Sequence, residues 1–259
     1  TNTMALFTDD SGATAWTIGN AGSTVDTATM NVDSDDGTLT IAGTINGTTD
    51  TDVLNIYDVG AGAAGNAVTF SGIIGATTPI DTINIGSTAD PGNGDFNASV
   101  SATNFNMTAG GAAGETAVVD FASGTTATIG TVTMTAGSAN ANQDVTLTMT
   151  DAIGAATAIT MDDVATKGST LITISNSAAR AFGGTVDGAA AGEGHITVND
   201  SDDNLAAGAV TFSGNIGATK SLLEVHVGAD DATAGNAVFQ GSLAATTINL
   251  ESGEHNDED

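Results

Sequence analysis

Positively charged residues are almost absent from this sequence. Lys167, Arg180 and Lys220 stand against 31 acidic residues, and the formal net charge is −28. Because proteins bind nucleic-acid phosphates through Lys and Arg, this composition excludes a nucleic-acid partner. An anionic membrane surface is disfavoured for the same reason. The acidity is instead compatible with cation binding, with a high-salt environment or simply with solubility.

Cysteine, aromatic residues and long apolar runs are also scarce. The absence of Cys excludes disulfides and zinc–thiolate sites. No apolar run is long enough to cross a bilayer, so we expect no membrane insertion. The start, TNTMALFTDD, has no signal-peptide pattern and no initiator Met, so we expect a processed chain or a piece of a longer one. With aromatics at 4%, any core must be narrow and repetitive.

An internal duplication is the clearest positive feature of the chain. The string AVTFSGIIGAT at 67–77 returns as AVTFSGNIGAT at 209–219, an offset of 142. Residues of similar type extend the match between the two copies over about 43–110 and 184–253. We therefore expect a lead-in segment at 1–29, a repetitive β domain at 30–253 and an acidic tail at 254–259.

A shorter period lies beneath the duplication. Triplets that read apolar–Thr/Asn–apolar recur along the chain, as in MNV (30–32), LNI (54–56) and ITV (196–198). Such alternation predicts strands with one inward face, and Gly, Asn and Asp clusters predict the turns between them. Phe70, Phe96 and Phe121 recur at about the length of one solenoid coil, as do Phe212 and Phe239, and Val145 is expected to continue the first series.

The fold class predicted from these periods is all-β, as one continuous β-solenoid. In a solenoid each coil buries its apolar face only against its neighbours, and small side chains suit such a narrow stack. The alternative is two tandem β-sandwich domains divided near residue 150, with the duplication as a domain repeat. The region 110–160 joins the halves with the same strand pattern and no linker, which favours the solenoid. AAGETAVV is the nearest approach to a helical segment.

The duplicated string predicts which side chains point inward. Val68, Phe70 and Ile74 alternate toward the core, and Gly72 shares their parity, where a side chain would find no room. Ile73, which is Asn215 in the second copy, falls on the outward parity. We therefore expect Ile73 to be exposed and to form a contact between subunits.

Two acidic strings each follow an expected strand. Calcium prefers several carboxylate and carbonyl oxygens from a flexible turn, which alternating acids can supply. We therefore predict calcium sites at two DSDD strings, with the ligands Asp33, Asp35, Asp36, Asp200, Asp202 and Asp203. The simpler interpretation is a pair of solvated acidic turns in a very acidic protein.

Other chemistry finds little support in the sequence. His195, His226 and His255 have no partner at ligand spacing, and we expect all three to be exposed and without a role. No nucleophile elbow occurs, and paired carboxylates are too common here to indicate acid–base catalysis. We therefore do not expect an enzyme. A threonine ladder is not expected either, because the central residue of the triplets varies among Thr, Asn and His.

Strings such as AVTFSGNIGAT and TINL, in an acidic chain without Cys, resemble bacterial β-strand-repeat surface proteins, including S-layer proteins and secreted adhesins. The resemblance covers most of residues 30–253 and implies an extracellular, calcium-dependent protein that self-assembles. The nonapeptide calcium repeats common in that group are absent here. The expected function is a structural subunit of a surface layer, sheath or filament at the cell surface. The alternative is an adhesin or stalk segment that binds a cell-surface glycan.

Overall fold

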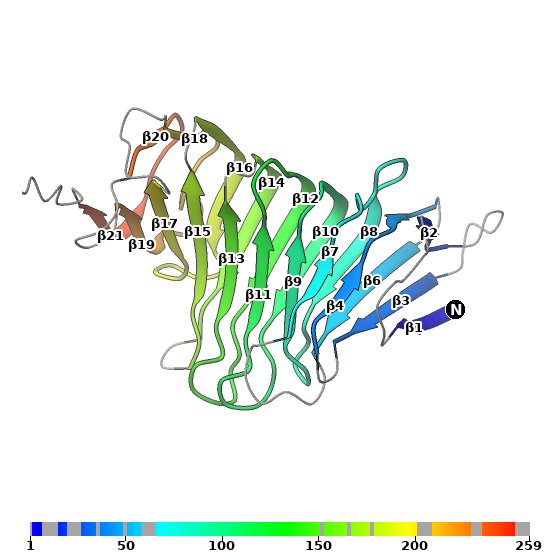
Figure 1. Cartoon of the computed structure of the whole chain (residues 1–259). Helices are drawn as coiled ribbons and strands as arrows, with labels where there is room; N and C mark the ends of the chain where they lie inside the picture. Colours follow the sequence, from blue (N-terminus) through cyan, green and yellow to red (C-terminus); the bar gives the residue numbers. More distant parts are fainter. Residues whose placement is uncertain are drawn as a thin grey trace, which may run out of the picture.

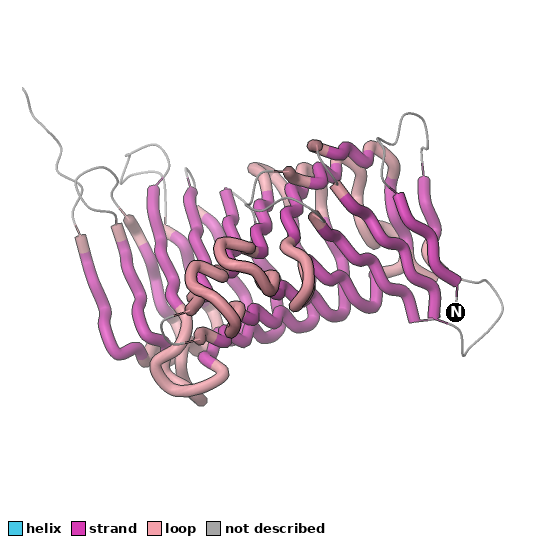
Figure 2. Tube along the Cα trace, turned by 90° about the horizontal axis from the view of Figure 1, so that it is seen from below, coloured by secondary structure: helices cyan, strands magenta, loops and turns pink. Residues whose placement is uncertain are grey.

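The computed structural model describes residues 2–6, 15–19, 27–34, 37–48, 51–58, 66–150, 153–164, 167–176, 179–200, 209–228 and 235–251. Over these ranges the chain is all-β, and stacked parallel strands form a β-solenoid of about seven turns. The strands lie side by side from β1 at one end to β21 at the other (Figure 1). Figure 2 shows the same stack as strands joined by loops, without helices. The predicted fold class is confirmed.

Two long parallel sheets make up the solenoid, and the chain passes from one to the other in each coil. The first has ten strands, in the order β1 (Asn2–Leu6), β3 (Thr27–Asp33), β6 (Thr51–Tyr57), β8 (Ile80–Ile85), β10 (Val100–Thr108), β12 (Thr126–Thr135), β14 (Ile153–Asp162), β16 (Arg180–Gly188), β18 (Val210–Phe212) and β20 (Ala237–Phe239). The second has nine, in the order β21 (Ala245–Leu250), β19 (Leu222–Val227), β17 (His195–Asp200), β15 (Thr170–Asn176), β13 (Val145–Thr150), β11 (Ala117–Phe121), β9 (Gly92–Phe96), β7 (Val68–Phe70) and β4 (Leu39–Ile41).

A short pair, β2 (Ala15–Thr17) and β5 (Thr44–Asn46), forms a further side at the N-terminal end. Ile45 of β5 bridges to Ile74, and Ile74 bridges to Val100 at the start of β10. This side therefore continues into the first half of the long strands of the ten-stranded sheet. β1 and β2 lie within the segment 1–29 that the sequence sets apart as a lead-in, and both pair with strands of the solenoid.

Ladders of paired, inward-parity residues fill the core, and three of them show how the coils stack. The first is Ile45–Ile74–Val100–Ala127–Gly154–Phe182–Phe212–Phe239. The second is Leu54–Ile83–Phe105–Val132–Ile159–Val186–Ile216–Leu243. The third is Ile41–Phe70–Phe96–Phe121–Met149–Ile174–Val198–Val227–Leu250. Each coil thus buries its apolar residues against the coils before and after it.

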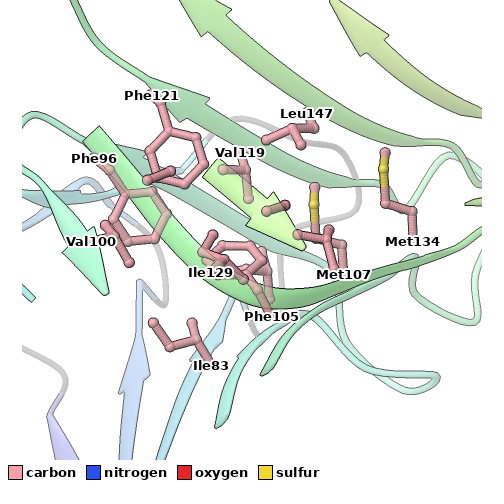
Figure 3. Packing of buried hydrophobic residues seen from close by; sticks show 14 of the residues in the cluster. Ile83, Phe96, Val100, Phe105, Met107, Val119, Phe121, Ile129, Met134 and Leu147 are labelled. Carbon is pink, nitrogen blue, oxygen red and sulfur yellow. The ribbon is translucent and has the colours of Figure 1, made fainter. Parts of the chain in front are cut away.

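Aromatic rings stack along the third ladder. The ring centroids of Phe70 and Phe96 are 5.1 Å apart, as are those of Phe96 and Phe121, and Phe105 lies edge-on to Phe96. Figure 3 shows Phe96, Phe105 and Phe121 within the buried cluster. The expectation that Val145 continues this series is wrong, because Phe121 pairs with Met149. The loop between β12 and β13 makes this coil longer, so Val145 pairs with Ala117 instead.

A row of asparagine side chains runs along the outer face of the ten-stranded sheet. Asn55 donates from its amide to Asn31 over 2.8 Å, Asn84 to Asn55 over 2.8 Å, and Asn106 to Asn84 over 2.9 Å. The amide oxygens of Asn31, Asn55 and Asn84 therefore each accept from the next coil, which helps to hold the coils in register. The central position of the triplets varies between Thr and Asn along the sequence, but the asparagines among them form an ordered ladder.

The two copies of the duplicated string lie on different sides of the solenoid. Phe70 belongs to the third ladder, whereas Phe212 belongs to the first. Five coils from Phe70 lead to Val198, and Phe212 lies 14 residues further along the chain. The offset of 142 residues is therefore five coils and one side, and the duplication is not a repeat of domains.

The turn at AAGETAVV is not helical. Gly114 has φ of 81°, and the Glu115 carboxylate accepts from the Ala112 amide over 2.7 Å before β11 begins at Ala117. The related turn at Ala190 repeats this arrangement, because Glu193 accepts from the Ala190 amide over 2.7 Å and Gly192 has φ of 84°. A carboxylate that closes a tight turn over a left-handed glycine explains the helix-like composition of this segment.

Candidate functional sites

Ile73 has the exposure expected from its parity. Its side chain is 42% exposed, whereas Val68, Phe70 and Ile74 around it are buried. At the equivalent place in the second copy, Asn215 accepts a hydrogen bond from the Ser242 amide of the next coil over 3.0 Å. The first copy therefore replaces a stabilising polar contact with an exposed apolar side chain. The role of Ile73 as a subunit contact stays a prediction.

Gly72 lies where the sequence predicts no room for a side chain. A Cβ at Gly72 would come within 2.3 Å of the carbonyl oxygen of Gly43 in the preceding coil. A Cβ at Gly214 would meet the carbonyl oxygen of Gly184 within 1.7 Å. The obstacle is thus the backbone of the adjacent coil rather than a core side chain, and both copies need glycine for the same reason.

The first DSDD string begins at a buried position. Asp33 ends β3 and is 9% exposed, and Ser34 after it is 2% exposed. Ser34 donates from its hydroxyl to the Asn66 carbonyl oxygen over 3.2 Å. Asp35 and Asp36 lie outside the described residues. A solvated acidic turn does not describe Asp33 and Ser34, because both are enclosed by the neighbouring coil.

Asp58, which the sequence analysis did not single out, lies beside this turn in the next coil. It is 1% exposed, and neither carboxylate oxygen has a hydrogen-bond partner within the described ranges. Burial raises the pKa of Asp58, and the charge of Asp33 raises it further. Asn66 and Ser34 lie near enough to lower this pKa but do not reach the carboxylate with hydrogen-bond geometry. A proton or a cation bound to Asp58 would offset the cost of burying this carboxylate beside Asp33.

The second DSDD string is only partly described. Asp200 ends β17, whereas Asp202 and Asp203 lie outside the described residues. Within those residues, no three His, Asp or Glu side chains already converge on one point as a metal centre does. Calcium binding at either string therefore stays a prediction.

A second pair of carboxylates stacks on the outer face of the nine-stranded sheet. Asp95 of β9 and Asp120 of β11 are register partners in adjacent coils. Burial raises the pKa of both carboxyls, and the charge of Asp95 raises the pKa of Asp120 further. The Asp120 Oδ1 atom is buried and has no hydrogen-bond partner in the described part of the chain. Like charges held this close make ionisation unfavourable.

The expectation that the histidines are exposed is wrong for His195 and His226. Both are half-buried on the outer face of the nine-stranded sheet, and both face carboxylates. The register pairs His195 directly with Glu224, while His226 lies two residues beyond Glu224 on the same face. Sequence spacing cannot reveal the partners that come from other coils, which are Asp163 and Glu224 for His195 and Glu251 for His226. Glu224 and His226 share β19, so their proximity follows from strand alternation. His255 lies outside the described residues.

Glu224 lies between the two imidazoles. Its Oε2 is 3.6 Å from His195 Nδ1, and its Oε1 is 3.9 Å from His226 Nδ1. Further out, His195 Nε2 is 3.8 Å from Asp163 Oδ2, and His226 Nε2 is 3.2 Å from Glu251 Oε2. We call these five residues the histidine–carboxylate row. A depression of about 170 Å³ beside it is lined by Ser169, Leu171, His195, Ile196, Thr197, Glu224 and His226.

The last described coil leaves inward-parity residues uncovered. Val225 and Val227 of β19 are 0% and 7% exposed, but their register partners in β21, Ile248 and Leu250, are 48% and 77% exposed. Nothing in the described part of the chain pairs with β20 or β21 on their outer edges. Among the described residues, no further coil therefore covers the surface that each inner coil buries against the next.

The described ranges contain no helix long and apolar enough to cross a membrane. Three comparisons with known proteins were made, and the chain matches no protein-family model, no curated protein and no solved structure.

Proposed function

We propose that this chain is a self-assembling structural subunit of an extracellular surface layer, sheath or filament. The observation that supports this most directly is the uncovered coil formed by β20 and β21. It has the apolar residues and the unpaired backbone groups that every inner coil buries. Unpaired strand edges readily add a strand from another chain, and a second copy of this chain has the matching parallel geometry.

The partner surface in this proposal is the N-terminal end of a second copy. There, among the described strands, β1 and β2 each pair on one side only, and Met4 of β1 is 40% exposed. A depression of about 200 Å³ at this end is lined by apolar and polar residues, among them Trp16, Ile18 and Met30. Contacts between two different ends propagate in one direction, so the expected product is a filament or a lattice of filaments.

Calcium has a defined place in this proposal. Copies that each have a formal charge of −28 repel one another, and a divalent cation near Asp33 and Asp58 would reduce that repulsion. Assembly would then be favoured outside the cell, where calcium is abundant.

The test is electron microscopy and light scattering of the purified chain with calcium and with excess EGTA. We expect filaments with calcium and their dissociation by the chelator. Leu250→Asp should abolish the filaments, because it places a charge in the coil-to-coil contact. The matched control is Leu223→Asp, since Leu223 is 37% exposed but belongs to a coil that is covered on both sides.

Monomeric rods under both conditions would refute the assembly. Filaments that persist unchanged in EGTA would refute the role of calcium alone.

A further inference from the structure

The histidine–carboxylate row contains imidazole and carboxylate groups that have no part in the proposed assembly. It contains the two described histidines of a chain that has only three, and both lie among carboxylates on consecutive strands. The side chains are partly enclosed, from 11% exposed for Asp163 to 36% for Glu251. Imidazole and carboxylate together are ligands that zinc, copper and nickel prefer, whereas calcium takes oxygen ligands.

The two ends of the row differ in how many hydrogen bonds their side chains already make. Asp163 accepts hydrogen bonds from the Thr170 and Gly194 amides over 2.6 and 2.7 Å, so its carboxylate is held by the fold. Glu224 accepts at Oε1 from the side-chain amide of Asn249. In contrast, His226 Nε2 and Glu251 Oε2 are both buried and have no hydrogen-bond partner within the described residues. They lie 3.2 Å apart without the geometry of a hydrogen bond.

The separations fit ligand atoms around a common ion. Two atoms that each bind a tetrahedral zinc at about 2.0–2.1 Å lie about 3.4 Å from one another. His226 Nε2 and Glu251 Oε2 are 3.2 Å apart, and His195 Nδ1 and Glu224 Oε2 are 3.6 Å apart. Both pairs therefore need only small side-chain movements to share an ion.

We propose that the histidine–carboxylate row binds a divalent transition-metal ion of the zinc class. His226 and Glu251 form the first ligand pair, and His195 and Glu224 form a second pair one coil earlier. Because no three of the described side chains already converge on one point, water completes the coordination of each ion. The affinity is accordingly lower than that of a closed structural zinc site with four protein ligands. This site is separate from Asp33 and Asp58 and does not depend on assembly.

A metal bound here would also connect neighbouring coils. His226 belongs to β19, and Glu251 directly follows β21, so the first pair joins the last two described coils of the nine-stranded sheet. Binding to the folded state alone raises stability by mass action, so the ion should raise the melting temperature. This gives a second measurement besides binding.

The test is calorimetric titration of the full chain with Zn²⁺ in physiological salt and excess Mg²⁺ and Ca²⁺, which occupy unspecific acidic sites. We expect zinc to bind despite these competitors and to raise the melting temperature. His226→Gln and Glu251→Gln should each weaken the tighter binding about tenfold or more. His195→Gln should remove the second binding event.

The matched control is His255→Gln, which removes the remaining histidine of the chain and should leave zinc binding unchanged. Melting curves without zinc show whether each variant folds, and having both Glu251→Gln and His226→Gln keeps the test valid if one does not. The proposal is overturned if zinc binds no better than calcium. It is also overturned if the His226, Glu251 and His195 variants all bind zinc as the wild-type chain does.

Discussion

Phe70 and Phe212 occupy the same position in two nearly identical strings, yet they lie on different sides of the solenoid. Phe70 pairs with Phe96 in the nine-stranded sheet, and Phe212 pairs with Phe182 and Phe239 in the ten-stranded sheet. The same short sequence can form either side, because each side has two inward apolar residues followed by a glycine where the chain turns. The glycines of the following turn agree as well, since Gly75 and Gly217 have φ of 72° and 68°.

Exchanging the one residue that differs between the strings should separate stability from assembly. Asn215→Ile removes the hydrogen bond to the Ser242 amide and should lower the free energy of unfolding by about 1 kcal/mol. Ile73→Asn offers the same acceptor to Ser99, the equivalent of Ser242 in the first copy, and should leave stability unchanged or slightly higher. If Ile73 is a subunit contact, Ile73→Asn weakens assembly all the same. Urea unfolding and light scattering measure the two effects, and unaltered assembly would rule out the contact.

The corner glycines should tolerate no side chain. Gly72→Ala and Gly214→Ala place a methyl group against the backbone of the adjacent coil, and we expect each to lower the free energy of unfolding by about 1–3 kcal/mol. Gly37→Ala is the control, because a Cβ there meets nothing within 4 Å. Chemical denaturation of the three variants checks this. Equal stabilities for Gly37→Ala and Gly72→Ala would contradict the proposed crowding.

The stacked rings should contribute more than any single outward residue. Phe96→Ala removes a side chain that contacts Phe70, Phe105 and Phe121, and it should lower the free energy of unfolding by about 3–5 kcal/mol. Val118→Ala on the outer face of the adjoining strand should have a much smaller effect. Thermal and urea unfolding measure both. A loss at Phe96 no larger than that at Val118 would show that the ladder is not the main core.

The Asp95–Asp120 pair should make stability depend on pH. Both pKa values are raised above the usual 3.8, so folding favours the protonated carboxyls. This contribution is complete below pH 3.8 and is lost as pH rises through the raised values. Asp120→Asn should therefore raise the melting temperature at neutral pH and reduce this pH dependence. Asp257→Asn in the acidic tail removes the same charge and serves as control, and an equal gain there would argue for general repulsion instead.

Replacing Asp58 should change the effect of calcium on the melting temperature. In EGTA at neutral pH, Asp58→Asn should raise the melting temperature, because it removes a buried charge beside Asp33. Calcium should raise the melting temperature of the wild-type chain more than that of Asp58→Asn, since the variant offers one carboxylate fewer. Differential scanning calorimetry with and without calcium makes this comparison. An identical calcium-induced shift in both proteins would exclude Asp58 as a ligand.

Much of the fold could be predicted from the amino-acid sequence. Alternating apolar residues, together with the spacing of about one coil between Phe70, Phe96 and Phe121, are enough to predict a β-solenoid. Parity alone places Val68, Phe70 and Ile74 inward and Ile73 outward. These predictions succeed because side-chain direction in a strand depends only on local alternation.

Relations between coils were decided only by the tertiary structure. Register determined that Met149 rather than Val145 follows Phe121, that the two copies of the string lie on different sides, and that His195 faces Glu224. Loop lengths set that register, and they vary from coil to coil, so residues about 25 positions apart meet in ways that spacing does not reveal. Composition and periodicity thus determined a narrow, acidic solenoid, whereas the stacking of coils decided which acids, asparagines and histidines became neighbours.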